Sequence, residues 1–212
     1  KTCFLFPGQG AQYPGMGKDL WESSPRVKDL FRVAAQSTGM DVEKLRFEGS
    51  EQELQATDKT QGAVTLVNVA AAAVLEEKGV HADGYAGFSL GEYSALCLAG
   101  VLRLEDLFPI VKVRGELMEK AARALDTPGQ APAGMAAVLG LGYAAAVKAL
   151  ESLQGEKIYL ANYSSPSQVV LGGTGEAIQK AEGVFKAAGA KRYIVLKVSA
   201  PFHTPLLEQA RV

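Results

Sequence analysis

The chain has 212 residues, of which 48% are hydrophobic and 21% charged, a composition typical of globular proteins. Lysine and arginine together number 22 and aspartate and glutamate 23, so the formal net charge is −1. Without a basic excess the chain has no non-specific attraction for phosphates, and we expect no nucleic-acid partner. Two cysteines and two histidines are too few for a disulfide framework or a His-rich metal site.

The most apolar long stretch, Gly62–Leu75, is too short to span a bilayer. The opening run Cys3–Phe6 leads directly into Pro7 and Gly8, which is unlike a signal peptide. We therefore expect no membrane association and a cytoplasmic α/β protein of enzyme size.

The first half of the chain predicts alternating strands and helices. In chain order these are the strand Cys3–Phe6, the helices Leu20–Ala35 and Gln61–Lys78, the strand Tyr85–Phe88, and the helices Gly91–Ala99 and Leu104–Leu125. Residues 7–17 hold four glycines and two prolines and predict a loop. Ser24 and Pro25 predict a helix N-cap and first turn. Gly79 is expected to end the second helix, and Pro109 to kink or restart the last one.

The composition changes near residue 126, where a Pro/Gly-rich linker (126–134) begins. The elements predicted after it are the strand Met135–Leu139, the helix Tyr143–Leu153, the strands Lys157–Ala161 and Gln168–Leu171, the helix Glu176–Ala188 and the strand Arg192–Val198. This βαββαβ order is the ferredoxin-like pattern. We predict a larger α/β unit at 1–126, a small α+β unit inserted at 127–198, and a return to the larger unit at 199–212.

The glycine-rich opening does not fit a nucleotide-binding loop. A G-x-G-x-x-G motif starting at Gly8 would need a glycine where Tyr13 stands. The spacing from Gly10 to Gly15 is that of a P-loop, but Met16 follows where lysine is required. The loop is either a structural turn or a set of backbone N–H groups aimed at an anion or oxyanion.

The segment Gly87–Gly91 reads G-F-S-L-G and matches the nucleophile elbow G-x-S-x-G. Small flanking residues are needed because the serine sits on a sharp turn between a strand and a helix. A strand is predicted before Ser89 and a helix after it. The context therefore favours Ser89 as a catalytic nucleophile over a chance match.

A serine nucleophile needs a base, and the chain has only His81 and His203. His81 follows a predicted helix end, where a solvated capping role is typical. His203 follows a predicted strand, and the order serine then histidine is that of α/β-hydrolases, so we favour His203. Neither Asp106 nor Asp126 stands out as a third member, which makes a Ser-His dyad the simpler hypothesis.

Four motifs occur in order along the chain: FPGQGAQ at 6–12, GFSLGE at 87–92, VRGELM at 113–118 and FHTPL at 202–206. Together they resemble the malonyl-CoA:acyl carrier protein transacylase family and the related acyltransferase domains of polyketide and fatty acid synthases. The resemblance runs from the first residues to the end of the chain.

The resemblance implies a ping-pong transfer of a malonyl group for fatty acid synthesis, with a polyketide-pathway acyltransferase as the alternative that the sequence leaves open. Ser89 would attack the thioester of malonyl-CoA with His203 as base, and the phosphopantetheine thiol of acyl carrier protein would then take the acyl group. The backbone N–H groups of Gln9 and Leu90 would form the oxyanion hole. The resemblance implies no metal or redox cofactor. Malonyl-CoA would be a substrate.

Arg114 by itself would be read as a surface arginine in a helix. The resemblance implies instead that it grips the free carboxylate of malonate by a bidentate contact. Phe202 and Leu90 resemble the malonyl-type rather than the methylmalonyl-type members, with bulky Phe202 leaving little room for an α-methyl branch. Phe88 stands where the family has histidine, and we expect it to alter the pocket wall without abolishing the chemistry.

The resemblance also implies a fold, namely a hydrolase-like parallel-sheet subdomain with an inserted ferredoxin-like α+β subdomain. Family members continue past the position of Val212 with a further piece of the first subdomain. We therefore expect residues 1–212 alone to leave sheet edges and apolar faces uncovered.

Two alternatives stay open: a serine hydrolase or thioesterase that uses the same dyad, and a non-catalytic module that binds acyl carrier protein. Arg114 and the lack of an obvious triad acid argue against the hydrolase. Lys186, Lys191, Arg192 and Lys197 form a local basic stretch. This stretch either meets the acidic carrier protein or is a solvated face.

Overall fold

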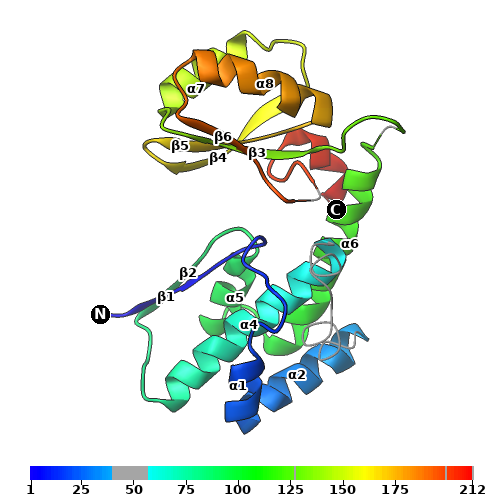
Figure 1. The fold of residues 1–212 in the computed structure, drawn as a ribbon. Coiled ribbons are helices and arrows are strands. Elements are labelled where there is room, and N and C mark those ends of the chain that lie inside the picture. Colours follow the sequence, from blue (N-terminus) through cyan, green and yellow to red (C-terminus); the bar gives the residue numbers. More distant parts are fainter. Residues whose placement is uncertain (40–56, 127, 199, 212) are drawn as a thin grey trace. The chain divides into compact units, whose positions relative to one another are not determined.

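The computed structural model describes residues 1–39, 57–126, 128–198 and 200–211 (Figure 1). The chain divides into two compact units, Lys1–Glu116 and Leu117–Val212. The division falls inside helix α6 (Leu104–Arg123), ahead of the Pro/Gly linker where the sequence predicts a boundary. That 127–198 is an insertion and 199–212 a return to the first unit stays a prediction.

The first unit contains a two-stranded parallel sheet. β1 (Cys3–Phe6) pairs with β2 (Gly84–Gly87) along their whole length. The helices of this unit are α1 (Lys18–Ser23), α2 (Pro25–Thr38), α4 (Thr57–Glu77), α5 (Gly91–Leu98) and the first part of α6. Helix α4 contacts α1, α2 and α5 and contributes much of the apolar core. This explains why the helix is apolar nearly all round.

Ser24 separates two helices where the sequence predicts one over Leu20–Ala35. Its backbone is extended, and its Oγ accepts a hydrogen bond from the N–H of Val27 at 3.2 Å. Pro25 takes the first helical position, where its missing N–H leaves no partner unsatisfied. The N-cap prediction is confirmed, and the single helix is wrong because the apolar spacing continues across a break in the backbone.

Helices α4 and α6 test two further predictions. Gly79 follows the end of α4 with φ 79°, the left-handed conformation expected just past a helix end. At Pro109 the sequence predicts either a kink or a restart of the helix. Helix α6 continues through Pro109, so the restart is wrong, and the kink stays a prediction. Pro109 lies near the start of α6, and its missing N–H removes only one hydrogen bond from the helix.

The second unit has the predicted βαββαβ order, which is thereby confirmed. Its elements are β3 (Gly134–Leu139), α7 (Tyr143–Glu151), β4 (Ile158–Ser165), β5 (Gln168–Gly173), α8 (Gly175–Ala187) and β6 (Arg192–Val195), followed by the 3-10 helix Pro205–Ala210. The four strands form an antiparallel sheet in the order β4-β5-β3-β6.

The sheet of the second unit buries both of its faces. Helices α7 and α8 cover one face of the sheet (Figure 1). Val138 and Leu171 pack with apolar residues of these two helices. Met135 and Val170, each one residue along the strand from a position facing the helices, point to the opposite face. There they pack with the end of α6 and with Phe202. The second unit therefore contains a hydrophobic layer on each side of its sheet.

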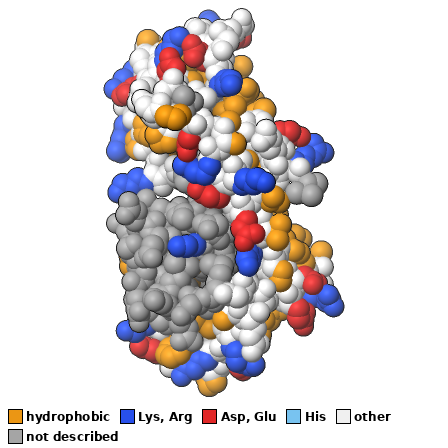
Figure 2. Space-filling model, turned by 90° about the vertical axis from the view of Figure 1, so that its right-hand side faces the viewer, with side chains coloured by type: hydrophobic (Ala, Val, Ile, Leu, Met, Phe, Trp, Pro, Cys, Tyr) orange, Lys and Arg blue, Asp and Glu red, His pale blue; other side chains and the backbone are white. Residues whose placement is uncertain are grey.

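Charged side chains of both signs are interspersed over the face shown in Figure 2, in keeping with the net charge of −1. In the described ranges, none of the helices combines the length and the apolar character needed to cross a bilayer.

Candidate active site

Ser89 lies at the turn between β2 and α5, as the nucleophile-elbow motif predicts. Its φ is 50°, in the left-handed region that non-glycine residues rarely adopt and that strained functional turns use. A Cβ at Gly87 would lie 2.1 Å from the carbonyl carbon of Gly91, and a Cβ at Gly91 would lie 2.1 Å from the carbonyl oxygen of Phe6. Both positions therefore require glycine, because any side chain would collide with the neighbouring backbone.

The guanidinium of Arg114 lies beside Ser89. Its Nη2 is 3.4 Å from Ser89 Oγ, and its Nη1 donates a hydrogen bond of 2.7 Å to Oε1 of Gln61. The guanidinium carbon lies 5.5 Å from the ring centroid of Tyr93. Burial lowers the pKa of the Arg114 guanidinium, an effect that Tyr93 and Glu92 oppose. Arginine stays protonated in proteins, so a cation lies next to the serine hydroxyl.

Buried polar side chains lie three or four residues apart along the apolar part of α4. Gln61, Thr65 and Asn68 are all buried, at 0%, 0% and 5% exposure. Gln61 binds Arg114, and Asn68 donates to the carbonyl oxygen of Pro7. The sequence prediction missed Gln61 and Asn68. The available signal was the presence of amides inside an apolar, alanine-rich helix.

The glycine-rich loop and the start of α5 hold the two predicted oxyanion donors. Gln9 is half-buried in the loop, and the following Gly10 donates its N–H to Oε1 of Gln12 at 2.7 Å. Leu90 is fully buried at the N-cap of α5. Within the described part of the chain, no group accepts a hydrogen bond from the N–H of Leu90.

His203 lies in the second unit, and Ser89 in the first, so their pairing stays a prediction. His203 is exposed and, like Ser89, has a positive φ, here 58°. The next residue, Thr204, donates its hydroxyl to the carbonyl oxygen of Pro201 at 2.7 Å, which closes the turn around the histidine. Phe202 is buried in the apolar layer under the sheet, with 7% exposure.

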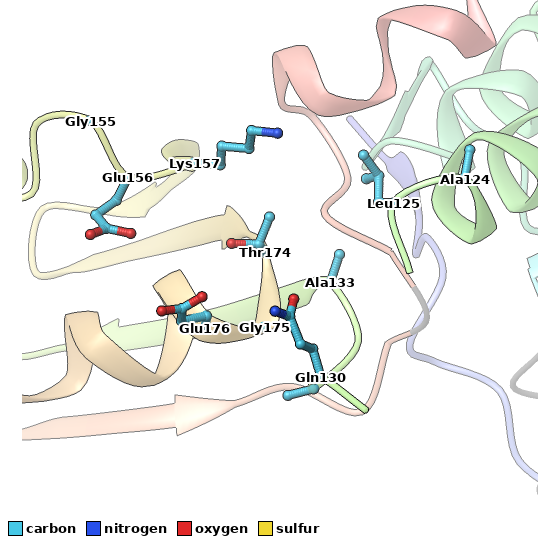
Figure 3. Close-up of a pocket in the computed structure, with 11 residues that line it drawn as sticks. Ala124, Leu125, Gln130, Ala133, Gly155, Glu156, Lys157, Thr174, Gly175 and Glu176 are labelled. Carbon is cyan, nitrogen blue, oxygen red and sulfur yellow. The ribbon is translucent and has the colours of Figure 1, made fainter. Parts of the chain in front are cut away.

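Two hollows lie elsewhere. One, of about 410 Å³, belongs to the second unit: Lys157, Thr174 and Glu176 line one part of it, and Leu125 and Gln130 the part near the linker (Figure 3). The other, of about 380 Å³, is apolar and lies between β1 and α4 in the first unit. Neither contains the predicted catalytic residues. Among the residues that the structure describes, no cluster of three His, Cys, Asp or Glu is placed to hold a metal ion.

Ser89 lies on a turn between a strand and a helix, with Arg114 beside it, and this places the chain among α/β proteins that carry a serine on a G-x-S-x-G turn. The acyl transferase domain model matches residues 3–211. The chain therefore belongs to the acyl transferase domain family.

Relatives and solved structures agree with this assignment. The chain is 40% identical over 215 residues to the malonyl CoA-acyl carrier protein transacylase of Bacillus subtilis, an alignment that covers 99% of the chain and 65% of the relative. It is 41% identical over 212 residues to the polyketide biosynthesis protein ThaF of Burkholderia thailandensis, covering 99% of the chain and 17% of that protein. A solved structure described as a type II PKS acyl-carrier protein in complex with its malonyl-transacylase contains a chain that matches with a TM-score of 0.90 and 38% identity. The match covers 99% of the present chain and 67% of the solved one. The chain thus spans about two thirds of the length of the transacylase from Bacillus.

Proposed function

We propose that this chain transfers a malonyl group from malonyl-CoA to the phosphopantetheine thiol of acyl carrier protein, supplying extender units for fatty acid synthesis. The observation that carries the proposal is the 3.4 Å contact between the Arg114 guanidinium and the hydroxyl of Ser89. A cation at this distance from a nucleophile suits an acyl group that carries a free carboxylate. The names of the relatives support the same substrate and partner.

The proposed reaction has two halves and an acyl-serine intermediate between them. Ser89 Oγ attacks the thioester carbonyl while His203 takes the hydroxyl proton, and CoA leaves as a thiol after receiving that proton. The phosphopantetheine thiol then attacks the malonyl-serine ester and gives its proton to His203. That proton returns to Ser89 Oγ, so the dyad ends as it began. No metal or redox group takes part in these steps.

In both halves the carbonyl oxygen becomes negatively charged, and we assign its stabilisation to the N–H groups of Gln9 and Leu90. The Leu90 N–H lies at the start of α5, where helix N–H groups lack partners within the helix. Loss of one such donor lowers kcat by about 100- to 1,000-fold in enzymes of this kind.

Selectivity for malonyl follows from Arg114. An acetyl group would leave the half-buried guanidinium without a carboxylate partner, which lowers the stability of the acetyl complex. We assign the exclusion of methylmalonyl to Phe202, whose bulk leaves little room for an α-methyl branch. Transfer from methylmalonyl-CoA with a malonyl-like kcat/KM would contradict this assignment.

In terms of architecture, we propose that the first unit corresponds to the hydrolase-like subdomain of the family and the second to the inserted ferredoxin-like subdomain. The parallel pairing of β1 with β2 supports the first correspondence. The sheet order β4-β5-β3-β6 supports the second.

We propose that the basic stretch of the second unit meets the acidic carrier protein. Lys191 and Arg192 are exposed at the start of the edge strand β6. Lys191→Glu should raise KM for carrier protein and leave acylation by malonyl-CoA unchanged. Lys148→Glu makes the same change of charge on α7 and serves as the control. An unchanged KM in Lys191→Glu would leave the stretch as a solvated face.

The transfer itself is tested by intact-mass measurement on the full-length protein incubated with malonyl-CoA or acetyl-CoA, without carrier protein. We expect a malonyl adduct that is absent from Ser89→Ala and a malonyl preference that is lost in Arg114→Ala. Free malonate and CoA without an adduct would instead identify a hydrolase. Neither adduct nor turnover would identify a binding module.

A further inference from the structure

The side chain of Asn68 joins three segments of the first unit. Its Nδ2 lies 3.1 Å from the carbonyl oxygen of Pro7 and 3.4 Å from Oγ of Ser94. Asn68 itself is 5% exposed, and Ser94 is fully buried. The three residues belong to α4, to the loop after β1, and to α5. An amide nitrogen carries two N–H donors, so one side chain can serve both acceptors.

The two segments that Asn68 holds are those that carry the proposed oxyanion donors. Pro7 is two residues before Gln9 in the loop, and Ser94 is four residues after Leu90 along α5. The separation between the two donor N–H groups therefore depends on how the loop and α5 are held together.

The backbone pairing of β1 with β2 aligns these segments up to the start of the loop. The register of β1 with β2 ends at Phe6 and Gly87, and the N–H of Phe88 then donates to the carbonyl oxygen of Phe6 at 3.0 Å. Pro7 has no N–H and cannot continue the ladder as a donor. Its carbonyl group is held by Asn68 instead.

We propose that Asn68 is a positioning residue that sets the distance between the N–H groups of Gln9 and Leu90. Asn68 contacts the loop and α5 and acts through them. The proposal rests on the proposed function, in which Ser89 is the nucleophile and these N–H groups stabilise the oxyanion. A displacement of about 1 Å within a catalytic arrangement lowers the rate by about 100-fold.

The test variant is Asn68→Asp in the full-length protein. Aspartate has nearly the same size but lacks both N–H donors, and its carboxylate would face the carbonyl oxygen of Pro7. We expect kcat for malonyl transfer to fall by about 10- to 100-fold. KM for malonyl-CoA should change by less than about threefold, because the contacts of Arg114 are untouched.

A second readout does not depend on the acyl group. A fluorophosphonate probe modifies an activated serine, and its phosphoryl oxygen uses the same donors as the oxyanion. The rate constant for labelling of Ser89 should fall in Asn68→Asp by a factor similar to that of kcat. Asn68→Leu, which removes the donors without adding charge, should behave alike.

Thr65→Val is the matched control, because Thr65 is buried on the same helix three residues away. It should keep the wild-type kcat and labelling rate. A merely structural role for Asn68 would lower the unfolding temperature and the fraction of labelled protein, but would leave the rate constant of the folded fraction unchanged.

The outcomes separate this proposal from the proposed function. Wild-type protein that is labelled by the probe yet forms no malonyl adduct contradicts the proposed substrate, and the labelling rates still decide the role of Asn68. A normal malonyl adduct with equal labelling rates in wild type and Asn68→Asp overturns the positioning role alone. A wild-type Ser89 that reacts with neither reagent overturns both.

Discussion

Arg114 reaches Ser89 and Gln61 through different nitrogens of one planar guanidinium. Lysine would keep the positive charge but not the fork that binds a carboxylate through two N–H groups. We therefore expect Arg114→Lys to lower kcat/KM for malonyl-CoA by about 10- to 100-fold, given about 1.5–3 kcal/mol for a hydrogen bond to a charged group. Transfer from acetyl-CoA should change much less. Steady-state kinetics with both thioesters provides the measurement, and equal losses for both would contradict a carboxylate contact.

Thr65 differs from Arg114, because its polar atom makes no hydrogen bond with the described residues. Its Oγ1 is fully buried, and among the described residues it finds no hydrogen-bond partner. A buried hydroxyl in this state costs about 1–3 kcal/mol. Thr65→Val keeps the shape and removes the hydroxyl, so the free energy of unfolding should rise by about 1 kcal/mol. Urea denaturation measures the change, and a loss of stability would reveal a hydrogen bond to Oγ1.

The residues of the site differ in how far the sequence could predict them. Ser89 is predictable because its turn is defined by five consecutive residues. Arg114 and Gln61 are 53 residues apart, and their pairing depends on how α4 and α6 pack. The helical pattern around Arg114 alone indicates a surface residue, and only the family resemblance points to the site. The contact of Asn68 with Pro7 spans 61 residues and has no local pattern at all.

Helix α8 and strand β6 are linked by the phenol of Tyr193, which donates a hydrogen bond of 2.7 Å to the carbonyl oxygen of Ile178. Burial raises the pKa of the Tyr193 phenol well above its ordinary value of 10.0. The folded state thus favours the neutral phenol. This contribution to stability is complete below pH 10, and it is lost as the pH rises toward the folded-state pKa, because only the unfolded chain ionises in that range.

Tyr193→Phe should therefore have an effect that depends on pH. At pH 8 the variant should be less stable than wild type by about 0.5–1.5 kcal/mol, the usual contribution of one hydrogen bond. At pH 11 the difference should close, because the wild type loses about 1.4 kcal/mol per pH unit above 10 through this group. Denaturant titrations at the two pH values measure both differences. A difference independent of pH would mean that the folded phenol ionises normally.

Elements were predicted best where a local signal marks their ends. Ser24 and Gly79 are such signals, and each has the capping geometry expected of it. The apolar spacing over Leu20–Ala35 hides the break at Ser24, because both helices turn an apolar side to the same core. Strand β6 is shorter than predicted, ending at Val195, since its partner β3 pairs only with residues 192–195. The register of paired strands depends on tertiary contacts, which the sequence pattern does not contain.

At the scale of the whole molecule, the two units differ in how complete their sheets are. The four-stranded sheet of the second unit is covered on both faces, and the described residues that form both apolar layers lie within Leu117–Val212. The described part of the first unit has a two-stranded sheet, with Leu5 of β1 75% exposed. Two-stranded sheets depend on other elements for stability, whereas a covered sheet of four strands can be stable alone.

We therefore expect a fragment of residues 117–211 to fold without the first unit. Circular dichroism should show a mixed α/β spectrum and a single cooperative thermal transition, as small domains with their own core usually do. Leu171→Asp places a charge in the fully buried layer between sheet and helices and should abolish the transition. A fragment that melts without cooperativity, like its Leu171→Asp variant, would mean that the second unit needs the first to hold its sheet, and that the two fold as one.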